Sequence, residues 1–139
     1  MSAARDTDLS ERVIAAAIAV HTALGPGLFE SIYERALCIE LQHAGIAVRN
    51  QVELPVSYRG HSLGVGLRLD LLIDERLVAE IKSVSHLDEV HLKQVISYLR
   101  VAGLKTALLI NFNVKRLTEG IRRVSVRSFP NSVFSVISV

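Results

Sequence analysis

Charged side chains alternate with apolar ones in two short segments of the chain. Arg68 and Asp70 share one face of a predicted strand, and Glu80 and Lys82 share one face of the next. Successive side chains of a strand point to opposite faces of a sheet, so the other face of each strand is apolar. Its residues are Leu67, Leu69, Leu71 and Ile73 on the first strand, and Leu77, Ala79 and Ile81 on the second.

The turn between the two strands decides whether the charged side chains meet. Facing residues of an antiparallel pair point to the same side. A two-residue turn would put Asp70 and Glu80 on opposite faces, whereas an odd-length turn centred on Glu75 pairs them and also pairs Arg68 with Lys82. Burial of a common apolar face should select the second register. We therefore expect two carboxylates about 5 Å apart at their Cβ atoms.

Two neighbouring carboxylates favour a divalent cation, because they repel each other unless a proton or a cation lies between them. Hard cations such as Mg²⁺ prefer these oxygen ligands. Lys82 on the same face can hold or polarise a water, which suits phosphodiester hydrolysis. Spacing alone favours a simpler interpretation, in which the four side chains are cross-strand ion pairs on a solvated sheet face, each contributing about a few tenths of a kcal/mol.

The elements that must position these side chains follow from apolar periodicity and turn signals. Ser10 is a candidate N-cap, and Gly25-Pro26-Gly27 ends the first predicted helix. The apolar run 107–110 is typical of a central strand covered on both faces. The predicted order is helices 9–24 and 28–44, strands 46–58, 62–73 and 77–84, helix 87–102, strand 105–112 and an extended segment, 120–128. This order favours an α/β chain with a mixed, α+β type of sheet.

The second predicted helix carries acidic and aromatic residues beside its apolar ones. Glu30 lies three residues before Tyr33 and four before Glu34, so the three share a helix face. We expect the apolar face of this helix to consist of Ile32, Ala36, Ile39 and His43, with Leu37 and Leu41 lying next to it.

An ordered set of motifs gives the chain a family resemblance. Residues 27–33 read G-x-x-E-x-x-Y, and they are followed by Arg-x-Asp at 68–70 and Glu-x-Lys at 80–82. Gln94 to Leu99 and Leu108 to Phe112 add two further matches. Over about residues 9–124 the chain resembles the GxxExxY family, a branch of the PD-(D/E)XK nuclease-like superfamily. The resemblance implies a restriction-endonuclease-like α-β-β-β-α-β core with an additional N-terminal helix.

The resemblance also implies residue roles. The residues expected to carry chemistry are Glu30, Asp70, Glu80, Lys82 and Gln94. The three acids would be ligands of Mg²⁺ or Mn²⁺, the lysine would be catalytic, and the glutamine would complete the site from the long helix. The residues expected to support the site are Tyr33, Tyr98 and Arg68.

These observations lead to two hypotheses of different classes. The first is a magnesium-dependent nuclease that acts on DNA or RNA. The alternative is a non-catalytic module on the same fold that binds nucleic acid or protein. The net charge of +2 permits a nucleic-acid partner without demanding one. The apolar C-terminal tail also suggests a homodimer.

Composition sets the expected organisation. We expect a flexible N-terminus at residues 1–8, a single domain at 9–128, and a tail at 129–139 that could add a strand. Cys38 is the only cysteine, which excludes an internal disulfide. The sequence shows neither a signal peptide nor an apolar run long enough to span a bilayer, so we expect a cytoplasmic protein without a membrane partner.

Overall fold

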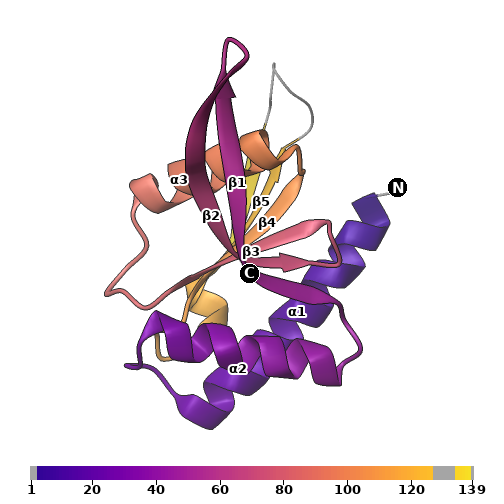
Figure 1. Ribbon diagram of the computed structural model, residues 1–139. Coiled ribbons are helices and arrows are strands. Elements are labelled where there is room, and N and C mark those ends of the chain that lie inside the picture. The colour runs from indigo at the N-terminus through magenta and orange to yellow at the C-terminus, as the bar shows by residue number, and fades with distance from the viewer. Residues whose placement is uncertain (1–2, 127–133, 139) are drawn as a thin grey trace.

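In the part of the chain that the structure describes, six strands form one mixed sheet whose strand order follows the chain (Figure 1). The computed structural model describes residues 3–126 and 134–138. Its elements are α1 (Ala3–Leu24), α2 (Glu30–His43), β1 (Val48–Tyr58), β2 (His61–Ile73), β3 (Leu77–Lys82), α3 (Glu89–Ala102), β4 (Thr106–Asn111), the 3₁₀ helix η1 (Leu117–Gly120), β5 (Ile121–Val126) and β6 (Phe134–Ser138). Strands β3 and β4 are parallel and are joined through α3, whereas all other neighbours are antiparallel. The predicted order of elements and the mixed sheet are confirmed.

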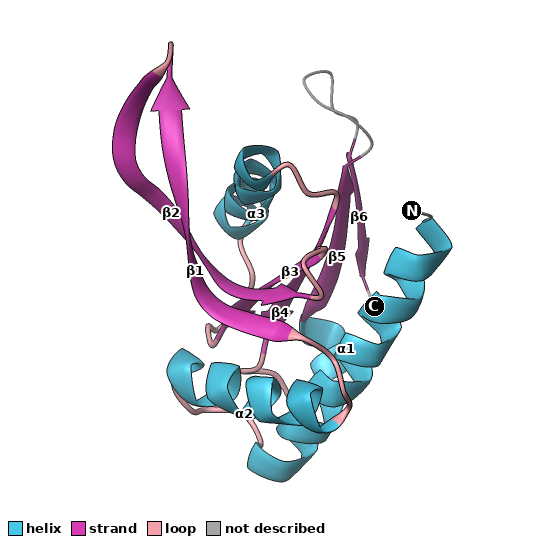
Figure 2. Cartoon of the chain, turned by 45° about the vertical axis from the view of Figure 1, so that its right-hand side comes forward, coloured by secondary structure: helices cyan, strands magenta, loops and turns pink. Residues whose placement is uncertain are grey.

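Helices cover both faces of the sheet (Figure 2). Helices α1 and α2 pack on one face through a cluster that includes Val13, Leu37 and Ile110. Helix α3 packs on the other face, where Leu99 belongs to a cluster with Leu109. Every residue of β4 is buried, as predicted for a central strand between two helical layers.

Helix α1 begins earlier than predicted. Residues 3–8, expected to be a flexible N-terminus, form its first turns. Ser10 is not the N-cap, because its hydroxyl donates a hydrogen bond to the Asp6 carbonyl one turn back. Leu9 is buried in the core, and Arg76 forms an ion pair with Asp6 at 3.4 Å. These contacts hold the early turns against the body of the protein.

Helix α2 buries a different face from the predicted one. Ile32 and Ile39 are exposed, Ile39 by 55%, whereas Tyr33, Leu37 and Leu41 are fully buried. The Tyr33 ring stacks on Phe112 at 4.4 Å between centroids. Anchoring this large ring in the core rotates the helix by about one residue from the predicted orientation.

The predicted register between β2 and β3 is confirmed. Leu71 pairs with Ala79 and Ile73 with Leu77, which leaves a three-residue turn centred on Glu75. Glu75 has a positive φ of 55°. The pairing ends at Leu71, however, so the predicted pairing of Arg68 with Lys82 is wrong.

Strand β2 changes its faces at Asp70, so the prediction of one continuous leucine row is also wrong. Leu71 belongs to the cluster under α1 and α2, but Leu69 belongs to the cluster under α3. The neighbouring strand β1 is distorted at the same level, where Gln51 has a positive φ of 53°. Beyond this point β2 pairs only with β1, and Arg68 lies opposite Glu53.

The outer part of β1 and β2 projects from the body as a two-stranded ribbon (Figures 1 and 2). We call residues 54–67 the arm. Its tip is the turn Arg59-Gly60, and both residues have positive φ. Pro55 lies at an irregularity in the pairing of β1, which is an edge strand and tolerates a residue without an N–H.

The C-terminal segment adds the predicted extra strand. Strand β6 pairs with β5 of the same chain, from Val126 with Phe134 to Arg122 with Ser138. Residues 129–133 of the predicted tail lie outside the described residues. No helix in the described part of the chain combines the length and apolar character needed to cross a membrane.

Candidate active site

Asp70 and Glu80 lie side by side where β2 and β3 separate. The main-chain N–H of Asp70 donates to Glu80 Oε2 at 2.9 Å, and the N–H of Ile81 donates to Asp70 Oδ2 at 2.8 Å. The two carboxylates thus replace the main-chain ladder beyond the last paired residues. Among the described residues, these bonds leave Asp70 Oδ1 and Glu80 Oε1 without a hydrogen-bond partner.

Burial makes ionisation of this pair unfavourable. Glu80 is only 3% exposed. Loss of solvation, and then the nearby charge of Asp70, raise the pKa of Glu80 to about 8. Burial also raises the pKa of Asp70, with smaller contributions from the charges of Glu34 and Glu30. The Lys82 ammonium acts in the opposite direction on both carboxyl groups but does not cancel the effect of burial.

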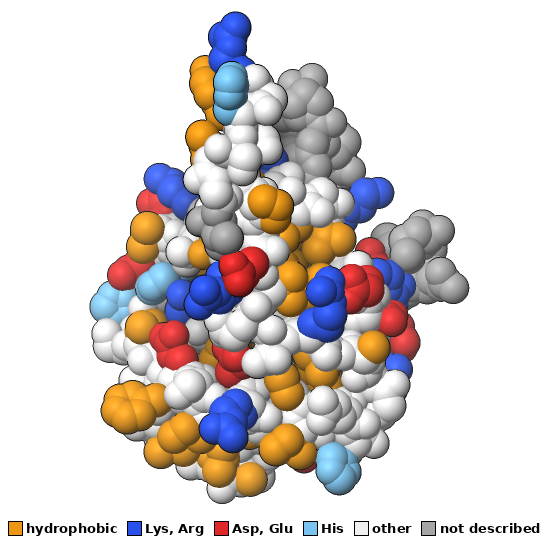
Figure 3. All heavy atoms as spheres, viewed as in Figure 1, with side chains coloured by type: hydrophobic (Ala, Val, Ile, Leu, Met, Phe, Trp, Pro, Cys, Tyr) orange, Lys and Arg blue, Asp and Glu red, His pale blue; other side chains and the backbone are white. Residues whose placement is uncertain are grey.

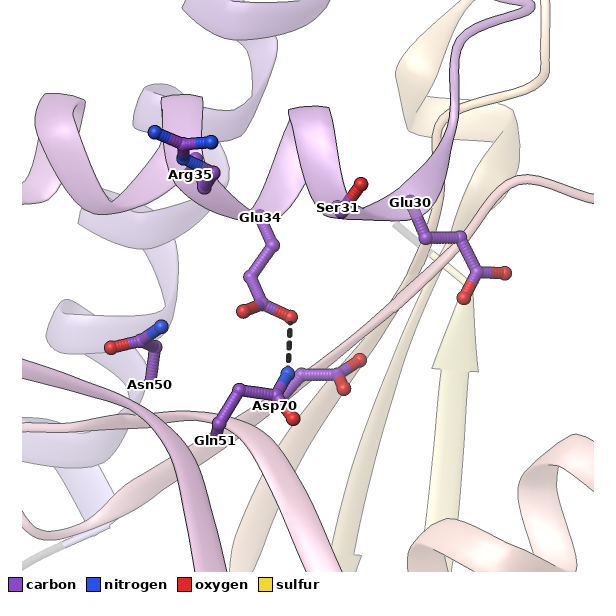
Figure 4. A pocket seen from close by; sticks show the side chains of 7 residues that line it. All are labelled: Glu30, Ser31, Glu34, Arg35, Asn50, Gln51 and Asp70. Atoms are coloured by element: carbon purple, nitrogen blue, oxygen red, sulfur yellow. Dashed lines mark hydrogen bonds between the residues drawn. The ribbon is translucent and has the colours of Figure 1, made fainter.

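Helix α2 brings further carboxylates to the same region (Figure 4). Glu30 is the first residue of the helix, and its Oε2 accepts a hydrogen bond from Ser83 N at 3.2 Å. Glu34 is buried, and its Oε1 accepts from Gln51 Nε2 at 2.8 Å. A pocket of about 380 Å³ lies between α2 and the base of the arm, and it is lined by Glu30, Ser31, Glu34, Arg35, Asn50, Gln51 and Asp70.

Glu34 is the residue of this pocket that sequence reasoning left out of the site. Its spacing of four from Glu30 placed both on one helix face, and that was the available signal. What the sequence did not show is that Glu34 would be buried against the sheet, since the predicted apolar face of α2 lay elsewhere.

Tyr33 holds the turn from which Glu30 projects. Its hydroxyl donates to the Gly25 carbonyl at 2.5 Å and accepts from Leu28 N at 3.1 Å. Gly27, inside this turn, has a φ of 97°, a conformation that favours glycine. The G-x-x-E-x-x-Y spacing therefore has a structural cause, because the tyrosine closes the turn that starts the helix carrying the glutamate.

Two residues on α3 differ in how they relate to the carboxylates. Tyr98 is buried, and its pKa is raised first by burial and then by the charges of Glu80 and Asp70, so its hydroxyl lies in their field. Gln94, expected to complete the site, is exposed on α3, and no side-chain hydrogen bond joins it to the carboxylates within the described residues. Its role at the site stays a prediction.

The two basic residues of the predicted cluster also lie apart. Lys82 ends β3 and is half-buried, two residues beyond Glu80 and on the same strand. Arg68 is exposed on the arm side of β2. The Lys82 charge thus acts on both carboxyl groups, whereas Arg68 lies opposite Glu53 on β1, and its supporting role stays a prediction.

Asn111 fixes the segment that follows Lys82, a role that sequence reasoning missed. Its side chain is buried, accepts a hydrogen bond from Val84 N and donates one to the Val84 carbonyl, both at 3.0 Å. Phe112 N also donates to the Lys82 carbonyl at 2.9 Å. The available signal was a lone asparagine at the end of an apolar strand, because a buried amide must find hydrogen-bond partners.

Comparison with known proteins agrees with this geometry. A family model described as the PD-(D/E)XK nuclease superfamily matches residues 7–124. The chain belongs to the PD-(D/E)XK nuclease superfamily. Glu80-Ile81-Lys82 matches the (D/E)XK motif in the superfamily's name. Asp70 matches the aspartate of its PD motif, although Leu69 stands in place of the proline. No curated protein and no solved structure gives a significant match.

The donor set suits the hard divalent cation that PD-(D/E)XK nucleases typically use. Asp70 and Glu80 offer two adjacent, partly unpaired carboxylates in a buried site, and such a pair needs a cation or a proton between its charges. Within the described residues, no three His, Cys, Asp or Glu side chains are gathered closely enough to hold a metal. The Asp70–Glu80 pair is thus the pair of adjacent carboxylates that the fold brings together at this place.

Proposed function

We propose that this protein is a magnesium-dependent nuclease of the GxxExxY type, which hydrolyses phosphodiester bonds in DNA or RNA. The observation that carries the proposal is the pair Asp70 and Glu80, buried side by side where two strands separate, with Lys82 beside them. An isolated surface ion-pair network would not explain why both carboxyl groups have a raised pKa.

In this proposal the metal ion, Mg²⁺ or Mn²⁺, is held by Asp70, Glu80 and Glu30. Once bound, it would neutralise charge on the phosphate and lower the pKa of a water. Glu30 already lines the pocket that contains Asp70, and it would reach the ion by a change in its side-chain conformation. Its present hydrogen bond to Ser83 N is long enough, at 3.2 Å, to be exchanged at low cost.

The remaining side chains have positioning roles. The Lys82 ammonium would orient the attacking water and stabilise negative charge on the phosphate. Tyr98 would hold the carboxylate pair from the α3 side. Gln94 and Arg68, which are exposed in the structure, would contact the nucleic acid when its backbone enters the pocket.

The test is a panel of single- and double-stranded DNA and RNA incubated with Mg²⁺ or Mn²⁺. We expect cleavage by the wild-type protein and none by Glu80→Ala. Glu40→Ala is the matched control, because Glu40 is an exposed glutamate on α2 outside the pocket. Calorimetry should show magnesium binding that Asp70→Ala loses. Equal cleavage or equal heats in the wild type and these two variants would contradict the proposal.

A second candidate is a non-catalytic module that binds nucleic acid on the same surface. It is favoured by one observation, the lack of a preassembled group of three ligands within the described residues. The same panel separates the candidates, because such a module would show salt-sensitive binding without cleavage, unaffected by the divalent ion.

A further inference from the structure

The arm extends far beyond the body that contains the candidate site. Asp70 is the residue of β2 at the base of the arm, and His61 begins the strand at its tip. The strand advances by nine residue steps between them, which places the tip about 30 Å from Asp70 along the strand. Among the strands that the structure describes, only β1 pairs with β2 over this length (Figure 2).

The tip exposes large apolar side chains that belong to neither hydrophobic cluster of the described residues. Tyr58 is 64% exposed and Leu63 is 63% exposed. Tyr58 pairs with His61 across the ribbon, and Leu63 follows His61 by two residues. By strand alternation these three side chains share one face of the arm. An aromatic ring, an imidazole and a leucine on one face form a surface suited to contact with bases.

The arm carries positive charge without any acidic residue. Arg59 occupies the turn at the tip, and the sequence from residue 54 to 67 contains no Asp or Glu. The nearest acid on β1, Glu53, lies opposite Arg68 at the base. Figure 3 shows a basic and a histidine side chain beside hydrophobic ones at the top of the projection. This charge favours an anionic partner.

The ribbon is also slender. A Cβ atom on Gly66 would lie 2.2 Å from Val56 Cγ2, so the Val56 side chain fills the space beside Gly66 and the ribbon carries no second side chain there. Bare two-stranded ribbons fit the major groove of B-form DNA, which is about 12 Å wide. The deep, narrow major groove of an A-form RNA duplex does not admit them.

The base of the arm is a wall of the candidate active site. Asn50, Gln51 and Asp70 line the pocket, and the arm begins three residues further along β1 and β2, at residues 54 and 67. We propose that the arm lies in the major groove of double-stranded DNA while the phosphate backbone of the same duplex enters the pocket. This inference rests on the proposed nuclease function and names its substrate as duplex DNA. The reach of the arm corresponds to about nine base pairs at 3.4 Å each.

The test compares binding of DNA and RNA duplexes of the same sequence, about 21 base pairs or two helical turns long, by fluorescence anisotropy in Ca²⁺. The tip variant combines Tyr58→Ser, Arg59→Asn and Leu63→Ser; asparagine is preferred in this left-handed turn, so the hairpin is kept. We expect its Kd for the DNA duplex to rise about tenfold or more. We expect the wild type to bind the RNA duplex more weakly than DNA and the tip variant to leave that affinity unchanged.

The matched control combines Ile18→Ser, Leu24→Ser and Lys105→Asn, three changes of the same kinds at exposed positions away from the arm. It should bind DNA as the wild type does. Arg59→Asn alone, which removes only the charge, should give a smaller rise in Kd with a shallower salt dependence. Circular dichroism checks that each variant is folded.

Several results would overturn the inference. One is a tip variant that binds DNA like the wild type, and another is an RNA duplex that binds the wild type as tightly as DNA does. A third is a tip variant that keeps its DNA affinity but changes its oligomeric state, which would make the arm a protein contact. Cleavage is measured separately with Glu80→Ala as its control. A wild type that cleaves duplex DNA with an unaffected tip variant refutes only the arm, whereas a wild type that neither binds nor cleaves refutes the nuclease proposal as well.

Discussion

The ionisation of a single carboxyl group, that of Glu80, links the burial of the site to its chemistry. Its pKa in the folded protein is about 8, above the ordinary value of 4.5. In metal-free solution the folded state therefore favours the protonated form at neutral pH. The contribution of this bound proton to the free energy of unfolding is fully present below pH 4.5 and is lost as the pH rises towards 8.

Replacement of Glu80 by glutamine should remove this pH dependence. We expect Glu80→Gln to be more stable than the wild type at pH 8 by about 1–3 kcal/mol, and the difference to shrink towards pH 4.5. Urea unfolding in EDTA across this range measures it. Glu40→Gln, at an exposed position, should follow the wild-type curve. Parallel curves for Glu80→Gln and the wild type would contradict the assigned pKa.

Magnesium should stabilise the folded protein through the same two carboxylates. A ligand that binds only the folded state raises its free energy of unfolding. We expect Mg²⁺ to raise the Tm of the wild type and to have no effect on the Tm of Asp70→Asn. The rise should be larger at pH 8 than at pH 6, because the ion competes with a proton on Glu80. Thermal unfolding followed by circular dichroism tests this, and an equal rise in Asp70→Asn would contradict it.

The hydroxyl of Tyr33 can be tested apart from its ring. Tyr33→Phe keeps the stacking on Phe112 but removes the bonds to the Gly25 carbonyl and from Leu28 N. We expect a loss of about 1–2 kcal/mol in unfolding free energy, since buried main-chain groups lose their partner. Magnesium affinity should also fall, because Glu30 begins the helix that this turn presents. Retained stability and affinity would show that the hydroxyl is dispensable.

At the scale of elements, the strands separate around the site and the end of β4 keeps them in place. The side chain of Asn111, at the end of β4, forms hydrogen bonds with both the main-chain N–H and the main-chain carbonyl of Val84. We expect Asn111→Ala to cost about 2 kcal/mol and to reduce nuclease activity more than its effect on the folded fraction explains, because Lys82 lies two residues before Val84. Asn113→Ala, which removes a single 3.3 Å bond to Val84, is the milder control.

The strand register at the site was predictable, because alternation has a period of two and a shift by one residue would expose the apolar face. This reasoning placed Asp70 beside Glu80 and centred the turn on Glu75, as observed. It failed beyond Leu71, where β2 leaves β3. The bend that turns Leu69 to the other helical layer depends on β1 and α3, which a pattern within one strand does not contain.

The buried face of α2 was not predictable for a related reason. Its sequence offers two overlapping apolar stripes, and only the contact between Tyr33 and Phe112, far away in the chain, selects between them. The choice also determines that Glu34 is buried at the site. Local periodicity therefore identified the carboxylates on the strands more completely than those on the helix.

For the whole molecule, the sheet has two edges, and the chain treats them differently. The β1 edge is interrupted by Pro55 and a pairing irregularity, features that discourage pairing with another sheet. The other edge is β6, which covers β5 through pairings from Val126 with Phe134 to Arg122 with Ser138. The apolar tail that suggested a homodimer thus pairs within its own chain.

Removal of residues 131–139 should therefore promote self-association. Without β6, the edge of β5 presents unpaired N–H and carbonyl groups between two helical layers, and a second copy offers the same edge. We expect light scattering after size-exclusion chromatography to show a truncated chain that dimerises or aggregates at lower concentration than the full chain. A full chain that is dimeric, with a truncated chain that is monomeric, would instead assign the tail to a contact between copies. The proposed nuclease activity should persist in the truncated monomer, because within the described residues β6 pairs only with β5, and Asp70 and Glu80 lie on β2 and β3.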